Sequence, residues 1–255
     1  SVREPPRRPE ERARDLLRIW VFSRARAIDL ARQHAVLKMP QPIRRAGCHG
    51  ASMRPLSPFW HAAVRLTGRI DLSGLMLAGS TDPSRLDGRT LAGHGVAIDH
   101  AAALVTANQV GPTCHHLTLA DAGYPDALRW LPFAPPVLFV EGEDRLVNEP
   151  CVAIVGSRQS SGDGDRMSRL LAGAVAASGG VVVSGLAQGI DTAAHSAAPH
   201  RTIAVLGQGL DRALPSQRER MRRHILESGG LILSELLPTQ PAGRHTYPMR
   251  NRIIA

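Results

Sequence analysis

Between residues 137 and 234, short apolar runs alternate with glycine-rich turns and amphipathic stretches, and this alternation restricts the fold more than any other feature. The run at 151–155 is apolar throughout, as expected of a strand covered on both faces. In the next stretch, apolar positions recur with the i, i+3, i+4, i+7 spacing of a helix. Repetition of this unit predicts right-handed crossovers and an α/β, Rossmann-like, doubly wound sheet that is mainly parallel. The expected strands are 137–141, 151–155, 181–183, 202–206 and 231–233, and the expected helices are 162–178, 189–198 and 216–228.

Each of the last four expected strands ends in a turn that contains small residues. Ligands of open α/β sheets bind beyond the carboxyl ends of the strands, where such turns lead into helix N-termini. Small residues let backbone N–H groups approach a phosphate, and the helix dipole favours its negative charge. The sequence therefore predicts a phosphate-bearing ligand at this edge. The four turns are Gly156-Ser157-Arg158, Ser184-Gly185-Leu186-Ala187, Gly207-Gln208-Gly209 and Ser234-Glu235.

These turns do not match the common nucleotide-binding motifs. A P-loop has four residues between its glycines and a lysine after the second glycine. Here five residues separate Gly156 from Gly162, and Asp163 stands in the lysine position. A dinucleotide fingerprint has a different glycine spacing and an acidic residue at the end of the second strand, where this chain has Ser184. Both motifs are therefore rejected.

No catalytic or metal-binding set stands out in the sequence. There is no convincing Ser-His-Asp arrangement or pair of catalytic carboxylates. Asp191 and His195 are four residues apart on a short expected helix, where a loop-holding role and a general-base role are both open. Cys48, Cys114 and Cys151 are odd in number and widely spaced, which predicts no disulfide framework and no zinc knuckle. The residues alone therefore indicate no metal site and no cofactor, and they single out no catalytic mechanism.

The charge of the chain favours an anionic partner. The formal net charge is +9, and lysine contributes only Lys38 to the cations, the others being arginines. Arginine offers a planar fork that suits phosphate. Most of the excess, +8, lies in residues 1–120, so the second half must be judged on local clusters. One such cluster is Arg250-Asn251-Arg252, which together with Arg158 suggests a phosphate chain longer than one nucleotide.

Five motifs in the second half resemble the signatures of the DNA-processing protein A family (DprA, also called Smf). Their order and spacing agree with that family from about Leu117 to the end of the chain. The second motif matches the pattern SGxAxGxDxxAH, which runs here from Ser184 to His195. The motifs are CVAIVGSR at 151–158, SGLAQGIDTAAH at 184–195, TIAVLGQGLD at 202–211, SE at 234–235 and YPMRNRII at 247–254.

The resemblance implies a Rossmann-like domain that binds single-stranded DNA and performs no covalent chemistry. Members of the family protect incoming strands in natural transformation, load a RecA-type recombinase on them and act as dimers. Carried over to this sequence, the resemblance assigns Asp191 and His195 to organising the second turn. The DNA-binding residues it implies are Gly156, Ser157, Arg158, Ser184, Gly185, Gly207, Gly209, Arg250, Asn251 and Arg252.

The first part of the chain carries no comparable pattern. We expect residues 1–115 to form a helical or partly disordered region and residues 116–255 to form the DprA-type domain. A helix is expected at 15–38, shorter helical pieces at 59–66 and 98–107, and disorder at 1–14. Since the chain ends just after the fifth motif, we expect the sheet to be incomplete at its C-terminal side, with an exposed apolar edge at the fourth parallel strand, and dimer contacts to be reduced.

Two alternatives to a DNA-binding mediator stay open at this point. One is a non-functional remnant of the same family that retains the motifs but not a complete sheet. The other is a Rossmann-type nucleotide-phosphate hydrolase, although the PGGxGTxxE segment of the phosphoribohydrolases is absent. No signal peptide is visible, and the apolar stretch at 170–190 is interrupted by Ser178-Gly179-Gly180. A cytoplasmic protein without a membrane partner is expected.

Overall fold

The strands in the described part of the protein form one mixed eight-stranded sheet. The computed structural model describes residues 20–23, 52–79 and 82–255. The strand order is β1-β5-β6-β7-β8-β4-β3-β2. The strands, from β1 to β8, are Trp20–Ser23, Ser52–Pro55, Thr113–Thr118, Val137–Gly142, Cys151–Val155, Val181–Ser184, Thr202–Val205 and Leu231–Ser234.

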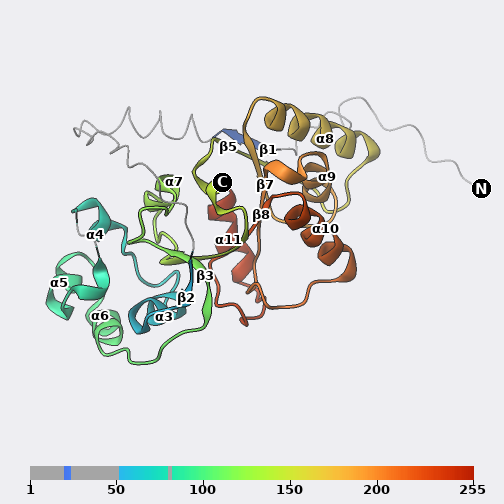
Figure 1. Cartoon of the computed structure of the whole chain (residues 1–255). Coiled ribbons are helices and arrows are strands. Elements are labelled where there is room, and N and C mark those ends of the chain that lie inside the picture. The colour runs from blue at the N-terminus through green and yellow to red at the C-terminus, as the bar shows by residue number, and fades with distance from the viewer. Residues whose placement is uncertain (1–19, 24–51, 80–81) are drawn as a thin grey trace, which may run out of the picture.

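The parallel part of the sheet consists of β5, β6, β7 and β8, with helices on both faces (Figure 1). Helices α8 (Gly162–Ala177) and α9 (Ile190–Ala197) cover one face, where they bury Ile154 and Val182, and α10 (Ser216–Glu227) lies beside α9. Helix α11 (Thr246–Ile254) and the short α7 (Asp126–Arg129) lie on the other face, over Val183 and Val205. The expected α/β class is therefore confirmed, and each expected strand and helix of this part lies within two residues of its observed bounds.

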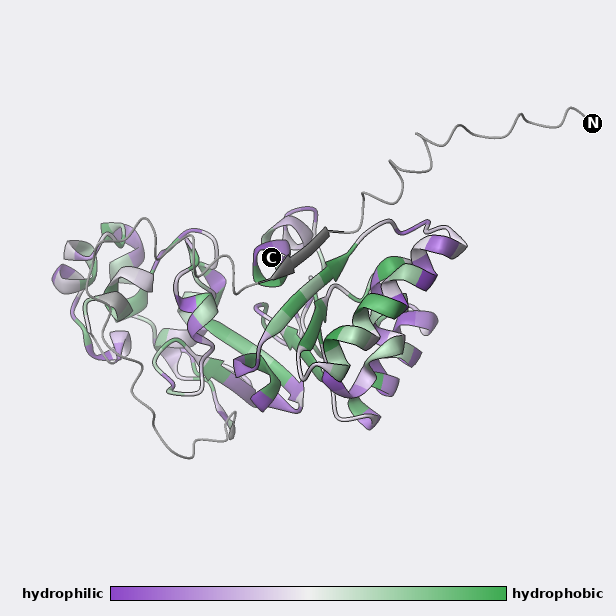
Figure 2. Ribbon diagram, turned by 90° about the horizontal axis from the view of Figure 1, so that it is seen from above, coloured by the Kyte–Doolittle hydropathy of each residue, from purple (hydrophilic) through white to green (hydrophobic). Residues whose placement is uncertain are grey.

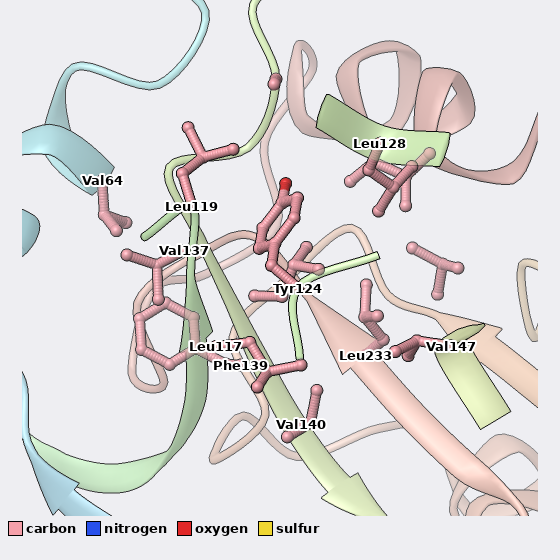
Figure 3. Packing of buried hydrophobic residues seen from close by; sticks show 14 of the residues in the cluster. Val64, Leu117, Leu119, Tyr124, Leu128, Val137, Phe139, Val140, Val147 and Leu233 are labelled. Carbon is pink, nitrogen blue, oxygen red and sulfur yellow. The ribbon is translucent and has the colours of Figure 1, made fainter. Parts of the chain in front are cut away.

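The strand β8 is not an exposed edge. It pairs in antiparallel fashion with β4, so that Phe139 lies opposite Ser234, and the sheet then continues through β3 and β2. The expectation of an exposed apolar edge at the fourth parallel strand is therefore wrong. The physical reason is that a segment from before the parallel strands returns to satisfy the backbone groups of β8. A large apolar core, which includes Tyr124, Phe139 and Leu233, fills the space between this strand pair and the helices (Figure 3).

A small helical unit precedes β3 in the chain. The expected helical pieces at 59–66 and 98–107 are present as α3 (Pro58–Arg65) and α6 (Ile98–Val105), which pack together. Between them lie α4 (Ser73–Leu77), the 3-10 helix η1 (Pro83–Arg85) and α5 (Gly88–Gly93). Two further 3-10 helices are η2 (Asp144–Asn148) and η3 (Pro199–Arg201). The division of the chain at residue 115 stays a prediction, and β3 runs across that position.

The expected helix at 15–38 is corrected where the structure describes it. Residues Trp20–Ser23 form β1, which pairs in antiparallel fashion with β5. Because β5 has β6 on its other side only, β1 satisfies backbone groups that would otherwise stand at an edge. The rest of this range and residues 1–14 lie outside the described residues.

The parallel strands are coloured largely as hydrophobic in Figure 2, and the helices show polar surfaces away from the sheet. This is the pattern of a sheet that is buried on both faces. Among the helices that the structure describes, none is both long enough and apolar enough to cross a membrane.

Candidate functional site

The turn after β5 fits closely against the start of α9. A Cβ atom at Gly156 would lie 2.7 Å from the Ile190 side chain, and one at Gly189 would lie 2.3 Å from the Ser157 carbonyl oxygen. Gly189 also has a φ of +85°, which side chains other than glycine rarely adopt. The N–H group of Ile190 donates to the same Ser157 oxygen at 3.2 Å. The first two turns therefore form one unit, and Arg158 is exposed on it.

Asp191 and His195 hold the second turn from inside. The carboxylate of Asp191 accepts hydrogen bonds from the N–H groups of Gly185 at 3.1 Å and Ala187 at 3.3 Å. Between them, the N–H group of Leu186 donates to Nε2 of His195 at 3.3 Å. Three successive N–H groups are thus used within the protein. The expectation that this turn offers its N–H groups to a phosphate is corrected for these three residues.

His195 is fixed in one neutral form. Because Nε2 accepts a hydrogen bond, the ring proton is assigned to Nδ1, which donates to the Thr202 hydroxyl at 2.8 Å. That hydroxyl donates in turn to the Val182 carbonyl at 2.9 Å. Burial lowers the pKa of His195 to about 3 and raises the pKa of Asp191. Neither side chain is open to solvent, which favours the loop-holding role over that of a general base.

Three more of the expected site residues lie at the same edge, but neighbouring parts of the chain pack against them. They are Ser184, Gly207 and Gly209. The Ser184 hydroxyl donates to the Ile154 carbonyl of β5 at 2.6 Å. A Cβ atom at Gly207 would lie 2.8 Å from the Tyr247 ring, and one at Gly209 would lie 2.1 Å from a backbone carbonyl before α11. These glycines therefore allow α11 and the segment before it to close over the strand ends.

The guanidinium group of Arg250 is buried among the strand ends. Its Nη1 donates to the Gly185 carbonyl at 2.9 Å and also to the Val205 carbonyl, and its Nε donates to Oδ1 of Asn251 at 3.2 Å. A Cβ atom at Gly185 would lie 2.5 Å from Nη1, so glycine is needed there for this approach. Desolvation lowers the pKa of Arg250, and the charge of Asp191 opposes that effect. Arg250 thus links α11 to β6 and β7, while Asn251 is exposed beside it.

Arg252 is also occupied inside the protein. Its Nη1 and Nη2 bind the two carboxylate oxygens of Glu235 at 2.8 and 2.6 Å, and the Glu235 side chain is 1% exposed. Nη1 and Nη2 also donate to the carbonyl groups of Met249 and Phe133, respectively. Arg250 and Arg252, which the resemblance assigns to DNA binding, are therefore both engaged in contacts within the protein. Buried acceptors compete for both guanidinium groups, and the sequence spacing does not reveal them.

A fourth arginine, to which no sequence motif points, joins this edge from α10. Nε of Arg218 donates to the Leu186 carbonyl of the second turn at 2.8 Å. Besides burial, the charges of Arg218 and Arg158 lower the pKa of Arg250, so the three guanidinium groups interact electrostatically. We refer to Arg158, Arg218 and Arg250 as the arginine cluster. The sequence signal for Arg218 is weak, because it is only one cation in the first turn of a helix that follows a parallel strand.

The arginine cluster faces little compensating negative charge. Asp191 is the acidic group that acts on Arg250, and it is buried beneath the second turn. Within the described part of the chain, neither Arg158 nor Arg218 forms an ion pair. A cluster of fixed positive charge with an exposed member is suited to binding an anion such as phosphate.

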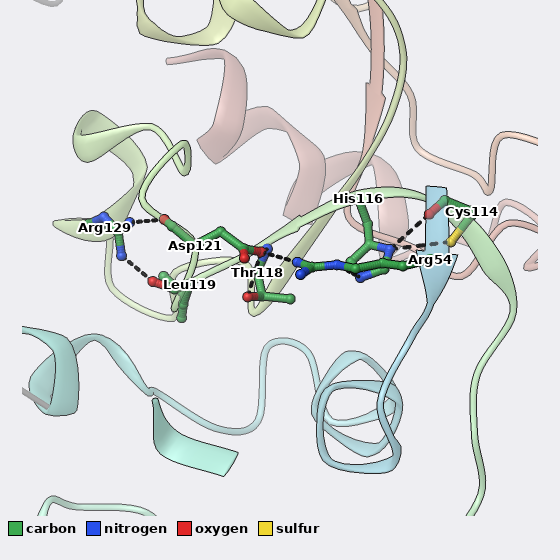
Figure 4. Close-up of polar contacts among 7 residues, drawn as sticks. All are labelled: Arg54, Cys114, His116, Thr118, Leu119, Asp121 and Arg129. Carbon is green, nitrogen blue, oxygen red and sulfur yellow. Dashed lines mark hydrogen bonds and ion pairs between the residues drawn. The ribbon is translucent and has the colours of Figure 1, made fainter. Parts of the chain in front are cut away.

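A second polar network ties β2 to β3 (Figure 4). Arg54 of β2 forms an ion pair with Asp121 at 2.6 Å and donates from Nε to Nε2 of His116 at 3.3 Å. The Asp121 carboxylate also accepts a hydrogen bond from the backbone N–H group of Thr118 at 2.7 Å, and Nδ1 of His116 lies 3.0 Å from the Cys114 carbonyl oxygen. These contacts close the turn after β3. Over the ranges that the structure describes, no group of three or more His, Cys, Asp or Glu side chains could hold a metal ion.

Comparison with known proteins identifies the family. The family model described as DNA recombination-mediator protein A matches residues 115–255, which is more than half of the chain. The chain belongs to the DNA recombination-mediator protein A family. This confirms the resemblance to the DprA/Smf proteins, and the matched segment contains all four turns and α11.

Relatives of the family match the same part of the chain. Protein Smf of Escherichia coli (strain K12) is 41% identical over 145 residues, which cover 55% of this chain and 39% of that protein. The DNA processing protein DprA of Streptococcus pneumoniae is 41% identical over 142 residues, which cover 54% of this chain and 49% of that protein. The matched segment thus spans less than half the length of these two relatives.

Two solved structures of the family have a similar fold. DNA processing protein A (DprA) from Streptococcus pneumoniae aligns with a TM-score of 0.62 and 29% identity, and the alignment covers 79% of this chain and 75% of that chain. DNA processing protein A from Helicobacter pylori, whose structure is described in terms of its single-stranded DNA binding mode, aligns with a TM-score of 0.51 and 30% identity. That alignment covers 55% of this chain and 65% of the Helicobacter pylori chain.

Proposed function

We propose that this protein binds single-stranded DNA at the carboxyl edge of its parallel strands and acts as a recombination mediator without covalent chemistry. The observation that carries the proposal is the arginine cluster, which combines three interacting guanidinium groups with one buried carboxylate. The described binding mode of the Helicobacter pylori family member supports the choice of single-stranded DNA.

The contacts divide the site residues into two groups. Arg158 is exposed, Ser157 is exposed beside it, and Arg218 is partly exposed, so these residues are proposed to touch the phosphate backbone. The Asn251 oxygen accepts from Arg250, which turns its NH₂ group away from that arginine and leaves it available to donate to a phosphate. The buried Arg250 positions this group.

The remaining residues expected in the site are proposed to shape it rather than to bind DNA directly. Gly156, Gly185, Gly207 and Gly209 allow close approach of the neighbouring side chains and carbonyl groups. Ser184 joins two strands, and Arg252 is paired with Glu235. This group sets the geometry in which Arg158 and Asn251 meet a phosphate.

Further parts of the proposal follow from the family. We propose that a RecA-type recombinase is loaded on the bound strand, that the protein acts in the cytoplasm during natural transformation, and that it forms a homodimer. No cofactor is proposed.

The test is fluorescence anisotropy of a labelled dT oligonucleotide titrated with the full chain at several salt concentrations. Arg158→Ala is expected to weaken binding about tenfold or more, as the loss of one charge-assisted contact does. For a single strand, the slope of log K against log salt is about −0.7 per neutralised phosphate, so the variant should have a shallower slope. The matched control is Arg145→Ala, an exposed arginine in η2, which lies at the opposite edge of the parallel strands.

Equal loss of affinity in Arg158→Ala and Arg145→Ala would indicate diffuse attraction by net charge and contradict the proposed site. Absence of binding together with non-cooperative thermal unfolding would instead identify a non-functional remnant. Turnover of a nucleotide by the purified protein would contradict the absence of covalent chemistry.

A further inference from the structure

Two exposed aromatic side chains stand in the short segment between α7 and β4. Trp130 is 58% exposed and Phe133 is 42% exposed, and no other aromatic residue is among the large exposed hydrophobic side chains of the described chain. Aromatic residues make up only 4% of the sequence. Exposure of an indole and a phenyl ring three positions apart is therefore unusual for this chain and needs a physical explanation.

This segment lies at the same edge of the sheet as the arginine cluster. Because β4 is antiparallel to β8, the residues before β4 lie at the carboxyl end of β8. The contact confirms this position, since the Phe133 carbonyl accepts a hydrogen bond from Nη2 of Arg252 at 3.1 Å, and Arg252 is paired with Glu235 just beyond β8. From β5, which carries Arg158, to β8 is three strand spacings, or about 14 Å.

Helix α11 makes contacts at both places. Arg250 binds carbonyl groups at the ends of β6 and β7, and Arg252 binds the Phe133 carbonyl. Asn251 stands between them in the chain and is exposed. Asn251 is therefore an exposed polar residue of α11 that lies in the chain between the arginine that binds the second turn and the arginine that binds the aromatic segment.

The backbone of Phe133 is held in a strained conformation. Its φ is +53°, in the left-handed region. This conformation is uncommon and strained for a bulky residue, whereas glycine or asparagine adopts it more readily. The hydrogen bond from Arg252 to the Phe133 carbonyl fixes this backbone. The arginine that pairs with the buried Glu235 thus also holds the backbone of the aromatic segment.

We propose that Trp130 and Phe133 form a platform on which bases of the bound single strand stack, while Arg158 and Arg218 bind its phosphates. This inference rests on the proposed function and adds the residues that contact the bases to those that contact the phosphates. Stacking on aromatic rings beside a cationic groove is the general way in which single strands are held without sequence preference. A duplex is excluded as the occupant, because its bases are already stacked on one another.

The experiment compares a dT oligonucleotide with an abasic oligonucleotide of the same length, which has the phosphates but no bases. Trp130→Ala is expected to weaken dT binding by about 5- to 150-fold, the range for one stacked base, and to leave abasic binding unchanged. Trp130→Phe should retain most of the dT affinity, because it keeps a ring. The control is Ile98→Ala, a similarly exposed apolar position on α6.

A second readout uses the protein itself. Stacking of a base on Trp130 should quench tryptophan fluorescence when dT is added, and the quenching should be lost in Trp130→Phe. Phe133→Leu, which removes the ring and keeps an apolar side chain, should weaken dT binding in the same direction.

The outcomes separate this inference from the proposed function. If Arg158→Ala loses dT binding and Trp130→Ala and Phe133→Leu do not, the platform is wrong and the phosphate site stands. If none of the three variants loses affinity, both are wrong. Equal weakening of dT and abasic binding by Trp130→Ala would show that the ring acts through the fold, which also overturns the platform.

Discussion

Arg252 and Glu235 form a two-point ion pair at the carboxyl end of β8, with N–O distances of 2.8 and 2.6 Å. The Glu235 side chain is 1% exposed and the Arg252 side chain 22% exposed. A buried carboxylate is tolerated when a partner of opposite charge and good geometry is present. The pair therefore joins α11 to the sheet, and any effect of Arg252 on DNA binding should operate through the fold.

Removal of the Glu235 charge should destabilise the protein strongly. In Glu235→Gln the Arg252 guanidinium group loses its buried counter-charge, and breaking such a pair costs about 3 kcal/mol. The free energy of unfolding, measured by urea titration, should fall by this amount. The matched control is Glu143→Gln, whose ion pair with Arg145 is exposed and should contribute less than about 1 kcal/mol. Equal effects of the two substitutions would contradict a structural role for the Arg252 pair.

A methyl group at Gly185 should displace Arg250. The added Cβ would lie 2.5 Å from Nη1, so the guanidinium group must move away from the carbonyl groups that it binds. We expect Gly185→Ala to lower the free energy of unfolding by about 1.5–3 kcal/mol, the range for hydrogen bonds to a charged group, and to weaken DNA binding.

The control for this prediction is Gly173→Ala in α8, where an added Cβ meets nothing within 4 Å. It should stabilise the protein by about 0.5–1 kcal/mol, because alanine favours a helix interior over glycine. A double-mutant cycle gives a direct measure: Arg250→Ala should cost less in the Gly185→Ala background than in the parent. Simple additivity would show that Gly185 and Arg250 do not act through their contact.

The parallel half of the fold could be predicted from the sequence because its strands are buried on both faces. The run at 151–155 is apolar throughout and ends in glycine, so both the existence and the bounds of β5 follow from composition. In contrast, β2 (Ser52–Pro55) contains arginine and proline and lies at the edge of the sheet, where neither alternation nor continuous apolarity is required.

The candidate site was predictable as a place but not as a set of contacts. The turns at the strand ends follow from topology, and Arg158 on the first turn is exposed. The partners of Arg250 and Arg252 outside α11 come from segments 17 or more residues away. In a sequence, a cation that binds a phosphate looks the same as one that binds a buried carbonyl or carboxylate. Arg218 was missed because its position depends on how α10 packs against the second turn.

The thiol of Cys114 should react slowly in the folded protein. Desolvation, together with the negative charge of Asp211, raises the pKa of Cys114 to about 11 from 9.0. Since the thiolate is the nucleophile, alkylation by iodoacetamide at pH 8 should be roughly 100-fold slower than for the unfolded chain. Peptide mapping by mass spectrometry measures the rate at this position, with the protein in guanidinium chloride as the reference.

Substitution of Asp211 tests the cause of that shift. Asp211→Asn removes the negative charge and should increase the alkylation rate of Cys114. If Cys114 of the native parent reacts as fast as in the unfolded chain, the raised pKa is contradicted. The exposed Asp163, which is on α8, offers a matched control as Asp163→Asn and should leave the rate unchanged.

Acidification should destabilise the protein through His195. Burial lowers the pKa of the folded-state imidazole to about 3 from 6.5, so between these values the unfolded state binds the proton and the folded state does not. This contribution to stability is present above pH 6.5 and is lost as the pH falls, with a slope of up to about 1.4 kcal/mol per pH unit. Burial also lowers the pKa of His61 and His116, so these histidines add to the pH dependence of stability. The contribution of His195 is therefore measured as the difference between the parent and a variant. The free energy of unfolding in urea, measured between pH 6.5 and 4.5, should depend less steeply on pH for His195→Gln than for the parent. The control is His200→Gln, which changes an exposed histidine. Parallel curves for the parent and His195→Gln would contradict a neutral, buried His195.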